Sequence, residues 1–203
     1  MLVVQNISKY YGNFLALDNI SFEINTGEVV AFLGPNGSGK TTTMRIITGF
    51  FAPSKGEILI DGIKIFEEPK RVKGFIGYLP ENPPLYPELT VEEYLKFVAE
   101  LKNMPVNLIK NRVDEVVELT GLLEKKSSLI STLSKGFKQR VGIAQSIVNN
   151  PKLLILDEPT VGLDPIQVIE IRNLIKNLEK EEKRTIILST HILSEASEIC
   201  KKA

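Results

Sequence analysis

The sequence is short of cysteine, has no long apolar run, and carries no excess charge of either sign. Cys200 is the single cysteine, which excludes an intramolecular disulfide and a cysteine-based zinc site. Nowhere do about 18 consecutive apolar residues occur, so we expect no membrane-spanning helix. The N-terminal residues lack the basic and apolar regions of a signal peptide. Lysine plus arginine and aspartate plus glutamate both number 25, so the chain has no overall attraction to nucleic acid or an anionic membrane.

What the sequence does contain is the succession of buried strands and helices that is typical of an α/β domain. The 203 residues, of which 43% are hydrophobic and 25% charged, suffice for one core with a smaller lobe. The apolar patterns predict strands at 2–7, 20–24, 29–33, 56–62, 75–79, 152–157 and 185–190, and helices at 41–48, 90–103, 106–120, 135–149 and 165–182, with a short helix at the end. We therefore expect a parallel sheet flanked by helices, an antiparallel N-terminal β layer, and a helical subdomain inserted at about 82–150.

Capping residues indicate where two of the predicted helices begin. Thr90 and Glu93 have the spacing of a capping box. Asp164 precedes Pro165, which combines an N-cap residue with a proline in the first turn. The three prolines within 82–89 exclude a helix or a central strand from that stretch.

The segment 34–41 reads G-P-N-G-S-G-K-T and matches the phosphate-loop pattern G-x-x-x-x-G-K-[ST] between a strand and a helix. Its glycines let successive N–H groups point at phosphate oxygens, and the helix N-terminus adds positive charge. Lys40 would bridge the β- and γ-phosphates as a point charge, and the Thr41 hydroxyl would bind Mg²⁺. The alternative is a simple glycine-rich turn. The residues assigned to the phosphate site are Gly34, Pro35, Asn36, Gly37, Ser38, Gly39, Lys40, Thr41 and Thr42.

A second chemical element is the apolar strand 153–157, which ends in Asp157 and is followed by Glu158. Ligands of an open parallel sheet bind at the carboxyl ends of its strands. Asp157 would hold the Mg²⁺ shell, and Glu158 would act as the general base that polarises the attacking water. A strand that merely ends in surface acids is the alternative.

With the segment 133–140, which reads L-S-K-G-F-K-Q-R, nearly the whole chain resembles the ATP-binding subunit of ABC transporters. The family signature is L-S-x-G-x-x-Q-R. The resemblance implies a RecA-like core and assigns Ser134, Gly136 and Gln139 to the ATP held by an opposite subunit. An N-cap serine at the start of a helix also forms an anion site on physical grounds. The alternative is an ordinary serine cap with a glycine in the first turn.

Smaller matches extend the resemblance. Gly162, Leu163 and Asp164 are similar to the D-loop, which touches the partner subunit. His191, the only histidine, directly follows the last strand and resembles the switch histidine that contacts the γ-phosphate. Tyr11 resembles the aromatic residue that stacks on adenine. Tyr10 could take that role instead, and either ring could simply pack in the sheet.

One position departs from the family pattern. The family commonly has glutamine after the strand that here ends in Y-L-P, but this chain has Glu81. A carboxylate can still ligate Mg²⁺ as a hard oxygen donor, although it adds negative charge near the γ-phosphate. The Y-L-P-E version resembles exporter-type ATPases, which favours export as the direction of transport.

The resemblance implies ATP and Mg²⁺ as cofactors and two kinds of partner: a second nucleotide-binding subunit, with a homodimer favoured, and an integral membrane permease. No nucleic acid is expected. The protein would lie in the cytoplasm, on the inner face of the cell membrane. Relatives of this type continue beyond the last helix, so we expect a C-terminal part that this chain does not include.

Other functions fit the sequence less well. ABC ATPases of translation usually carry two cassettes in one chain, and those of DNA repair are split by a long coiled coil; neither feature is present. A phosphate-loop kinase would not need the segment 133–140. A GTPase would need an N-K-x-D element to bind guanine, and none occurs.

Overall fold

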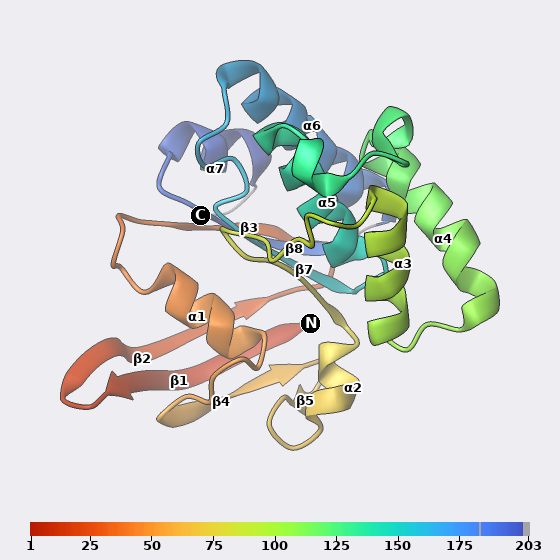
Figure 1. The fold of residues 1–203 in the computed structure, drawn as a ribbon. Helices are drawn as coiled ribbons and strands as arrows, with labels where there is room; N and C mark the ends of the chain where they lie inside the picture. The colour runs from red at the N-terminus through yellow and green to blue at the C-terminus, as the bar shows by residue number, and fades with distance from the viewer. Residues whose placement is uncertain (183, 201–203) are drawn as a thin grey trace.

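The computed structural model describes residues 1–182 and 184–200, which form two sheets with helices between and around them (Figure 1). The strands are β1 (Leu2–Tyr11), β2 (Phe14–Ile24), β3 (Val29–Leu33), β4 (Lys55–Ile60), β5 (Ile63–Lys64), β6 (Ile76–Leu79), β7 (Leu153–Asp157) and β8 (Thr185–Thr190). The helices are α1 (Lys40–Ile47), α2 (Pro69–Lys73), α3 (Val91–Leu101), α4 (Val106–Leu119), α5 (Lys135–Ile147), α6 (Pro165–Glu182) and α7 (Leu193–Ile199).

The central sheet is parallel, with the strand order β3-β8-β7-β6. Leu33 pairs with Thr190, and Leu79 pairs with Leu156, so the strands end at one shared edge. Since the chain leaves each strand at that edge, the phosphate loop after β3, the acids after β7 and the histidine after β8 come together there. The predicted parallel sheet flanked by helices is confirmed.

The second sheet is antiparallel, in the order β2-β1-β4-β5. Helix α1 lies between the two sheets, as Figure 1 shows. Its Met44, Ile46 and Ile47 are buried in one cluster with the antiparallel sheet and with the side chains of Leu153 and Ile155. The alternate residues of β7 belong to the other cluster, under the helices. This period of two means that β7 is buried on both faces, so that its side chains pack against both the helices and the layer formed by α1 and the antiparallel sheet.

The helical lobe contains α3, α4 and α5 on one side of the molecule (Figure 1). The predicted capping box is present: the Thr90 N–H donates to Glu93 Oε2 at 2.9 Å, and the Glu93 N–H donates to Thr90 Oγ1 at 3.3 Å. The Asp164 cap is also present, because its Oδ1 accepts from the backbone N–H groups of Ile166 and Gln167, both at 3.0 Å. No helix in the described part of the chain is long and apolar enough to cross a bilayer.

Several elements differ from the sequence predictions. Strands β1 and β2 are longer than predicted and meet in a hairpin, and β5 and α2 were not predicted. β5 forms because Asp61 and Gly62 both have positive φ, 50° and 76°, which is the two-residue turn that closes a tight hairpin. Two short 3₁₀ turns that were not predicted, Leu123–Lys125 and Ile130–Thr132, separate α4 from α5.

Candidate functional site

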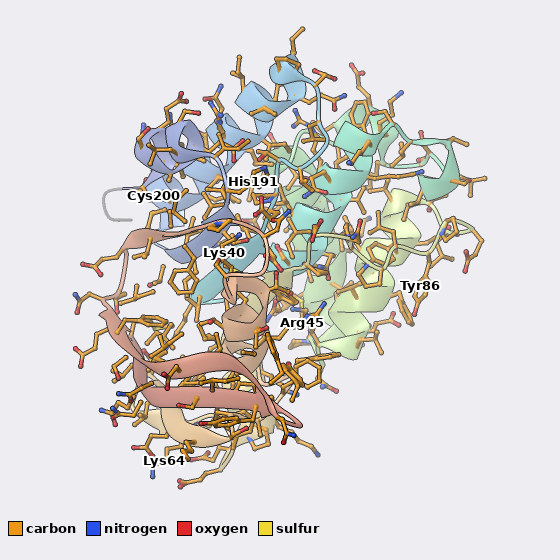
Figure 2. The ribbon with its side chains drawn as sticks, turned by 90° about the vertical axis from the view of Figure 1, so that its left-hand side faces the viewer. Lys40, Arg45, Lys64, Tyr86, His191 and Cys200 are labelled. Atoms are coloured by element: carbon orange, nitrogen blue, oxygen red, sulfur yellow. The ribbon has the colours of Figure 1, made fainter. Side chains whose placement is uncertain are left out.

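A cavity of about 370 Å³ lies where the β1–β2 hairpin, the phosphate loop and the ends of the parallel strands meet. Figure 2 shows Lys40 and His191 in this central region, between the antiparallel sheet and the helices. Many of the predicted site residues line the cavity, although they come from distant parts of the sequence. Its lining residues are Tyr11, Phe14, Ala16, Asn36, Gly37, Gly39, Lys40, Thr41, Thr42, Glu81, Glu158, Val161 and His191.

The phosphate loop has a backbone that only glycine adopts easily. Gly37 and Gly39 have φ values of 84° and 92°, in the left-handed region. A Cβ at Gly39 would also lie 2.6 Å from Leu17 Cδ2. Gly39 is the N-cap of α1, so the free N–H groups of the first turn face the cavity and make an anion site.

Lys40 is the cation of this cavity. Its Nζ donates to the carbonyl oxygens of Gly34 at 2.7 Å and Pro35 at 3.1 Å, and it lies 3.6 Å from Glu158 Oε1. The side chain is therefore folded back over its own loop. Carbonyl groups are weaker partners for an ammonium ion than phosphate oxygens, so a bound polyphosphate can replace these contacts.

Asp157 and Thr41 form an oxygen-rich corner beside the cavity. Thr41 Oγ1 donates to Asp157 Oδ1 at 3.4 Å, and Ser189 Oγ donates to the same oxygen at 2.5 Å. Asp157 Oδ2 is buried and has no hydrogen-bond partner among the described residues. A hydroxyl and a carboxylate with a free buried oxygen fit Mg²⁺, which takes few protein ligands and fills its shell with water and phosphate. This corner is not an all-protein cage, since no group of three or more acidic, cysteine or histidine residues that could hold a metal occurs within residues 1–182 and 184–200.

The charged environment extends to Tyr78, on the neighbouring strand β6. Burial raises the pKa of the Tyr78 hydroxyl to about 12, and the negative charge of Asp157 adds to that effect, while Arg45 opposes it. Tyr78 is therefore neutral at physiological pH.

Glu158 and His191 form a pair at the edge of the sheet. His191 Nδ1 lies 2.9 Å from Glu158 Oε2, and since an ionised carboxylate only accepts, Nδ1 carries the hydrogen. The Glu158 N–H donates to Ser189 Oγ at 2.9 Å. Glu158 has a φ of 49°, a left-handed conformation that costs a non-glycine residue about 1 kcal/mol or more. This turn aims the carboxylate at the cavity, where Oε1 has no hydrogen-bond partner within the described residues.

The aromatic part of the cavity comes from the β1–β2 hairpin. Tyr11 lines the cavity and Tyr10 does not, which supports Tyr11 over its neighbour as the base-stacking residue. Tyr11 pairs across the hairpin with Phe14, which also lines the cavity and is 68% exposed. Phe14 was not predicted as a site residue, because only the register of the hairpin places it beside Tyr11.

Tyr11→Ala should weaken ATP binding by about tenfold, because stacking of one base on one aromatic ring contributes roughly 1–3 kcal/mol. Tyr10→Ala is the matched control: Tyr10 is similarly exposed, at 41% against 45%, and should leave affinity unchanged. Titration of a fluorescent ATP analogue measures both variants. A loss of affinity in Tyr10→Ala alone would assign stacking to the other ring.

The predicted signature residues lie outside the cavity. Ser134 is exposed and caps α5 by accepting from the Phe137 N–H at 3.4 Å. Gly136 is buried, and a Cβ there would lie 2.7 Å from the side chain of Gln167. Gln139 is 5% exposed and lines a separate cavity of about 290 Å³ that it shares with Glu81. Within one chain, therefore, the signature residues do not reach the phosphate loop.

The remaining predicted residues take supporting positions in the loop. Gly34 and Pro35 contribute the carbonyl oxygens that hold Lys40, and Ser38 lines a neighbouring groove. Ser189 was not predicted, although it bridges the two acids. The only signal in the sequence was its place two residues before the sole histidine.

Comparison with known proteins gives a consistent result. The family described as "ABC transporter" matches residues 17–161. The bacitracin transport ATP-binding protein BcrA of Bacillus licheniformis is 41% identical over 194 residues, which are 96% of this chain and 62% of BcrA.

Solved structures match equally well. CbiO1 from Clostridium perfringens, part of the ABC transporter complex cbiONQ, has a TM-score of 0.88 and 37% identity, covering 98% of this chain and 81% of that one. The dimeric ATP-binding cassette MJ0796, in a post-hydrolysis state with ADP and Pi, has a TM-score of 0.85 and 32% identity, covering 97% and 90%. The chain spans between 62% and 65% of the length of four curated relatives.

Proposed function

Because this chain belongs to the ABC transporter family of ATP-binding proteins, we propose that it hydrolyses ATP in a head-to-tail dimer and thereby drives substrate movement through a separate membrane subunit. One observation carries the proposal: the cavity holds a phosphate loop, an acid–histidine pair and an aromatic wall, but none of Ser134, Gly136 and Gln139. A second chain would supply those residues from the opposite side.

Different residues of the cavity would bind the base, the phosphates and the Mg²⁺ ion. Tyr11 and Phe14 would stack on the base, and Lys40 with the N–H groups of α1 would hold the phosphates. Thr41 and Asp157 would hold Mg²⁺, and Glu81 could add an oxygen from the cavity wall. The ion, when bound, would neutralise charge on the phosphate oxygens. In the dimer, the N-terminus of α5 with Ser134 would face the γ-phosphate held by the other chain.

For hydrolysis, Glu158 would accept the proton of the attacking water at Oε1, which accepts no hydrogen bond from the described residues. His191 would hold Glu158 by the contact at Oε2 and present its other ring nitrogen toward the phosphate. Phosphoryl transfer to water needs no covalent intermediate with the protein, so positioning and charge stabilisation suffice. ATP would stabilise the closed dimer because it contacts both chains only in that state.

The finer assignments follow from the same scheme. Two identical chains are favoured because the residues of both half-sites are present in this sequence. The helical lobe would contact the membrane subunit on the inner face of the membrane, with Glu81 linking the nucleotide cavity to the cavity beside α5. We infer export as the direction, on the strength of the Y-L-P-E segment.

Ser134→Arg tests the dimer. Ser134 is exposed, so the chain should fold and its monomers should bind ATP with affinity within about twofold of wild type. The bulky cation would block the approach of the second chain, and ATP-driven dimerisation should disappear in gel filtration. Ser127→Arg, a substitution at another exposed serine, in a turn of the same lobe, is the control. Dimerisation of Ser134→Arg at the wild-type level would contradict the head-to-tail arrangement.

A further inference from the structure

Glu195, on α7, is a buried carboxylate that does not line the nucleotide cavity. It is 1% exposed, and each of its oxygens accepts a hydrogen bond from a different threonine. Thr160 Oγ1 donates to Oε1 at 2.8 Å, and Thr190 Oγ1 donates to Oε2 at 2.8 Å. Both threonines are themselves buried.

The two threonines are close in sequence to Glu158 and His191, which we call the reactive pair: Thr160 lies in the loop after β7, and Thr190 is the last residue of β8. Thr160 follows Glu158 by two residues, and Thr190 directly precedes His191. Thr190 Oγ1 also accepts from the Ile192 N–H at 3.1 Å, which fixes the turn on the far side of His191. A single carboxylate therefore joins the loop after β7 to the end of β8, close to the 2.9 Å contact between His191 and Glu158.

The charge of Glu195 has a local partner. Arg172, on α6, lies 3.5 Å from Glu195 Oε1 and 2.9 Å from Glu198 Oε2. A buried carboxylate is costly unless it is paired and hydrogen-bonded, and this one has a cation and two hydroxyl donors. Such a fully satisfied group restricts the positions of everything it binds.

We propose that Glu195 is a positioning residue that sets the separation and orientation of Glu158 and His191. Ser189 joins the same two strand ends from the sheet side, and Glu195 joins them from the helix side. The hydrogen bonds of Ser189 and those of Glu195 together restrict the positions of Glu158 and His191. The proposal rests on the proposed ATPase function for its kinetic consequence, but its geometric content can be measured without ATP.

The first experiment uses the fact that His191 is the only histidine. In full chain labelled with ¹⁵N-histidine and purified without a histidine tag, the imidazole resonances come from this residue alone. Glu195→Ala should shift or broaden them, because the contact of Nδ1 with Glu158 is no longer held at one distance. Glu198→Gln, which changes the exposed partner of the same arginine, should leave them in place.

The second experiment is kinetic. A displacement of about 1 Å in a catalytic group lowers a rate by up to 10²-fold, so Glu195→Ala should reduce kcat for ATP by roughly 10- to 100-fold. The KM and the affinity for ATP should stay within about twofold, since Glu195 does not line the cavity. Thr160→Val and Thr190→Val remove one hydrogen bond each and should give smaller losses of kcat, which keeps the test open if Glu195→Ala does not fold.

The outcomes separate the two proposals. Unchanged histidine resonances and unchanged kcat in Glu195→Ala, Thr160→Val and Thr190→Val would overturn the positioning role while leaving the ATPase intact. Absence of ATP hydrolysis by the wild-type chain would remove the proposed function, and the resonance shifts alone would then decide the role of Glu195.

Discussion

Glu158→Gln is expected to lower ATP turnover by about 10²- to 10⁴-fold, the usual contribution of a general base. Glutamine keeps the size and one oxygen of the side chain but cannot take a proton from water. Loss of the charge 3.6 Å from Lys40 frees that cation for phosphate, so ATP affinity should be equal to or higher than in the wild type. The variant should therefore accumulate as an ATP-bound dimer.

Two measurements check this result. Phosphate release gives the turnover, and gel filtration with ATP gives the oligomeric state. Glu88→Gln, a change at an exposed position in the proline-rich stretch, is the control and should retain the wild-type rate. Hydrolysis at the wild-type rate by Glu158→Gln would show that Glu158 is not the base.

Lys40→Ala should have the second large effect, on binding. A hydrogen bond to a charged group contributes about 1.5–3 kcal/mol, and the lost side chain also carried the only lysine charge on the cavity wall among the described residues. ATP affinity should fall by roughly 10- to 100-fold, and turnover should be lost at cellular ATP levels. Calorimetric titration with ATP measures the affinity.

The control for Lys40→Ala is Lys152→Ala. Lys152 is half-exposed, directly precedes β7 at the end of the parallel sheet away from the cavity, and is paired with Asp61. Its affinity for ATP should match the wild type. Melting temperatures of both variants separate lost binding from lost folding, because Lys40 also holds the carbonyl groups of Gly34 and Pro35. Full ATPase activity in Lys40→Ala would remove the phosphate-loop assignment.

The sequence predicted those parts of the molecule whose chemistry is local. Residues 34–41 need their glycines for backbone reasons, β7 and β8 are buried on both faces, and Thr90 and Asp164 cap helices within three residues of themselves. Such features can be predicted from the sequence because they depend on residues that are close together in the chain. The order of the chain along the parallel sheet then places Lys40, Glu158 and His191 at one edge.

The roles of Phe14 and Glu195 could not be predicted from the sequence, because they depend on strand register and on contacts with residues far away in the chain. The first half of β2 is a run of four apolar residues, 14–17, of which only Leu17 is buried. The run has no apolar–polar alternation, so it does not show the hairpin that brings Phe14 beside Tyr11. Glu195 stands in a short helix among serines and other polar residues, where it resembles a surface residue. Only the fold, which packs α7 against β8 and brings the loop after β7 beside it, places its carboxylate at Thr160 and Thr190.

The central claim is that one chain holds only half of a working nucleotide site. The measurement that tests it most directly is the rate of ATP hydrolysis per chain as a function of protein concentration, for the wild type and for Ser134→Arg. We predict that the wild-type rate per chain rises with concentration and then saturates as dimers form, while Ser134→Arg stays inactive at every concentration. A constant rate per chain down to concentrations at which only monomers exist, equal in both proteins, would contradict the account.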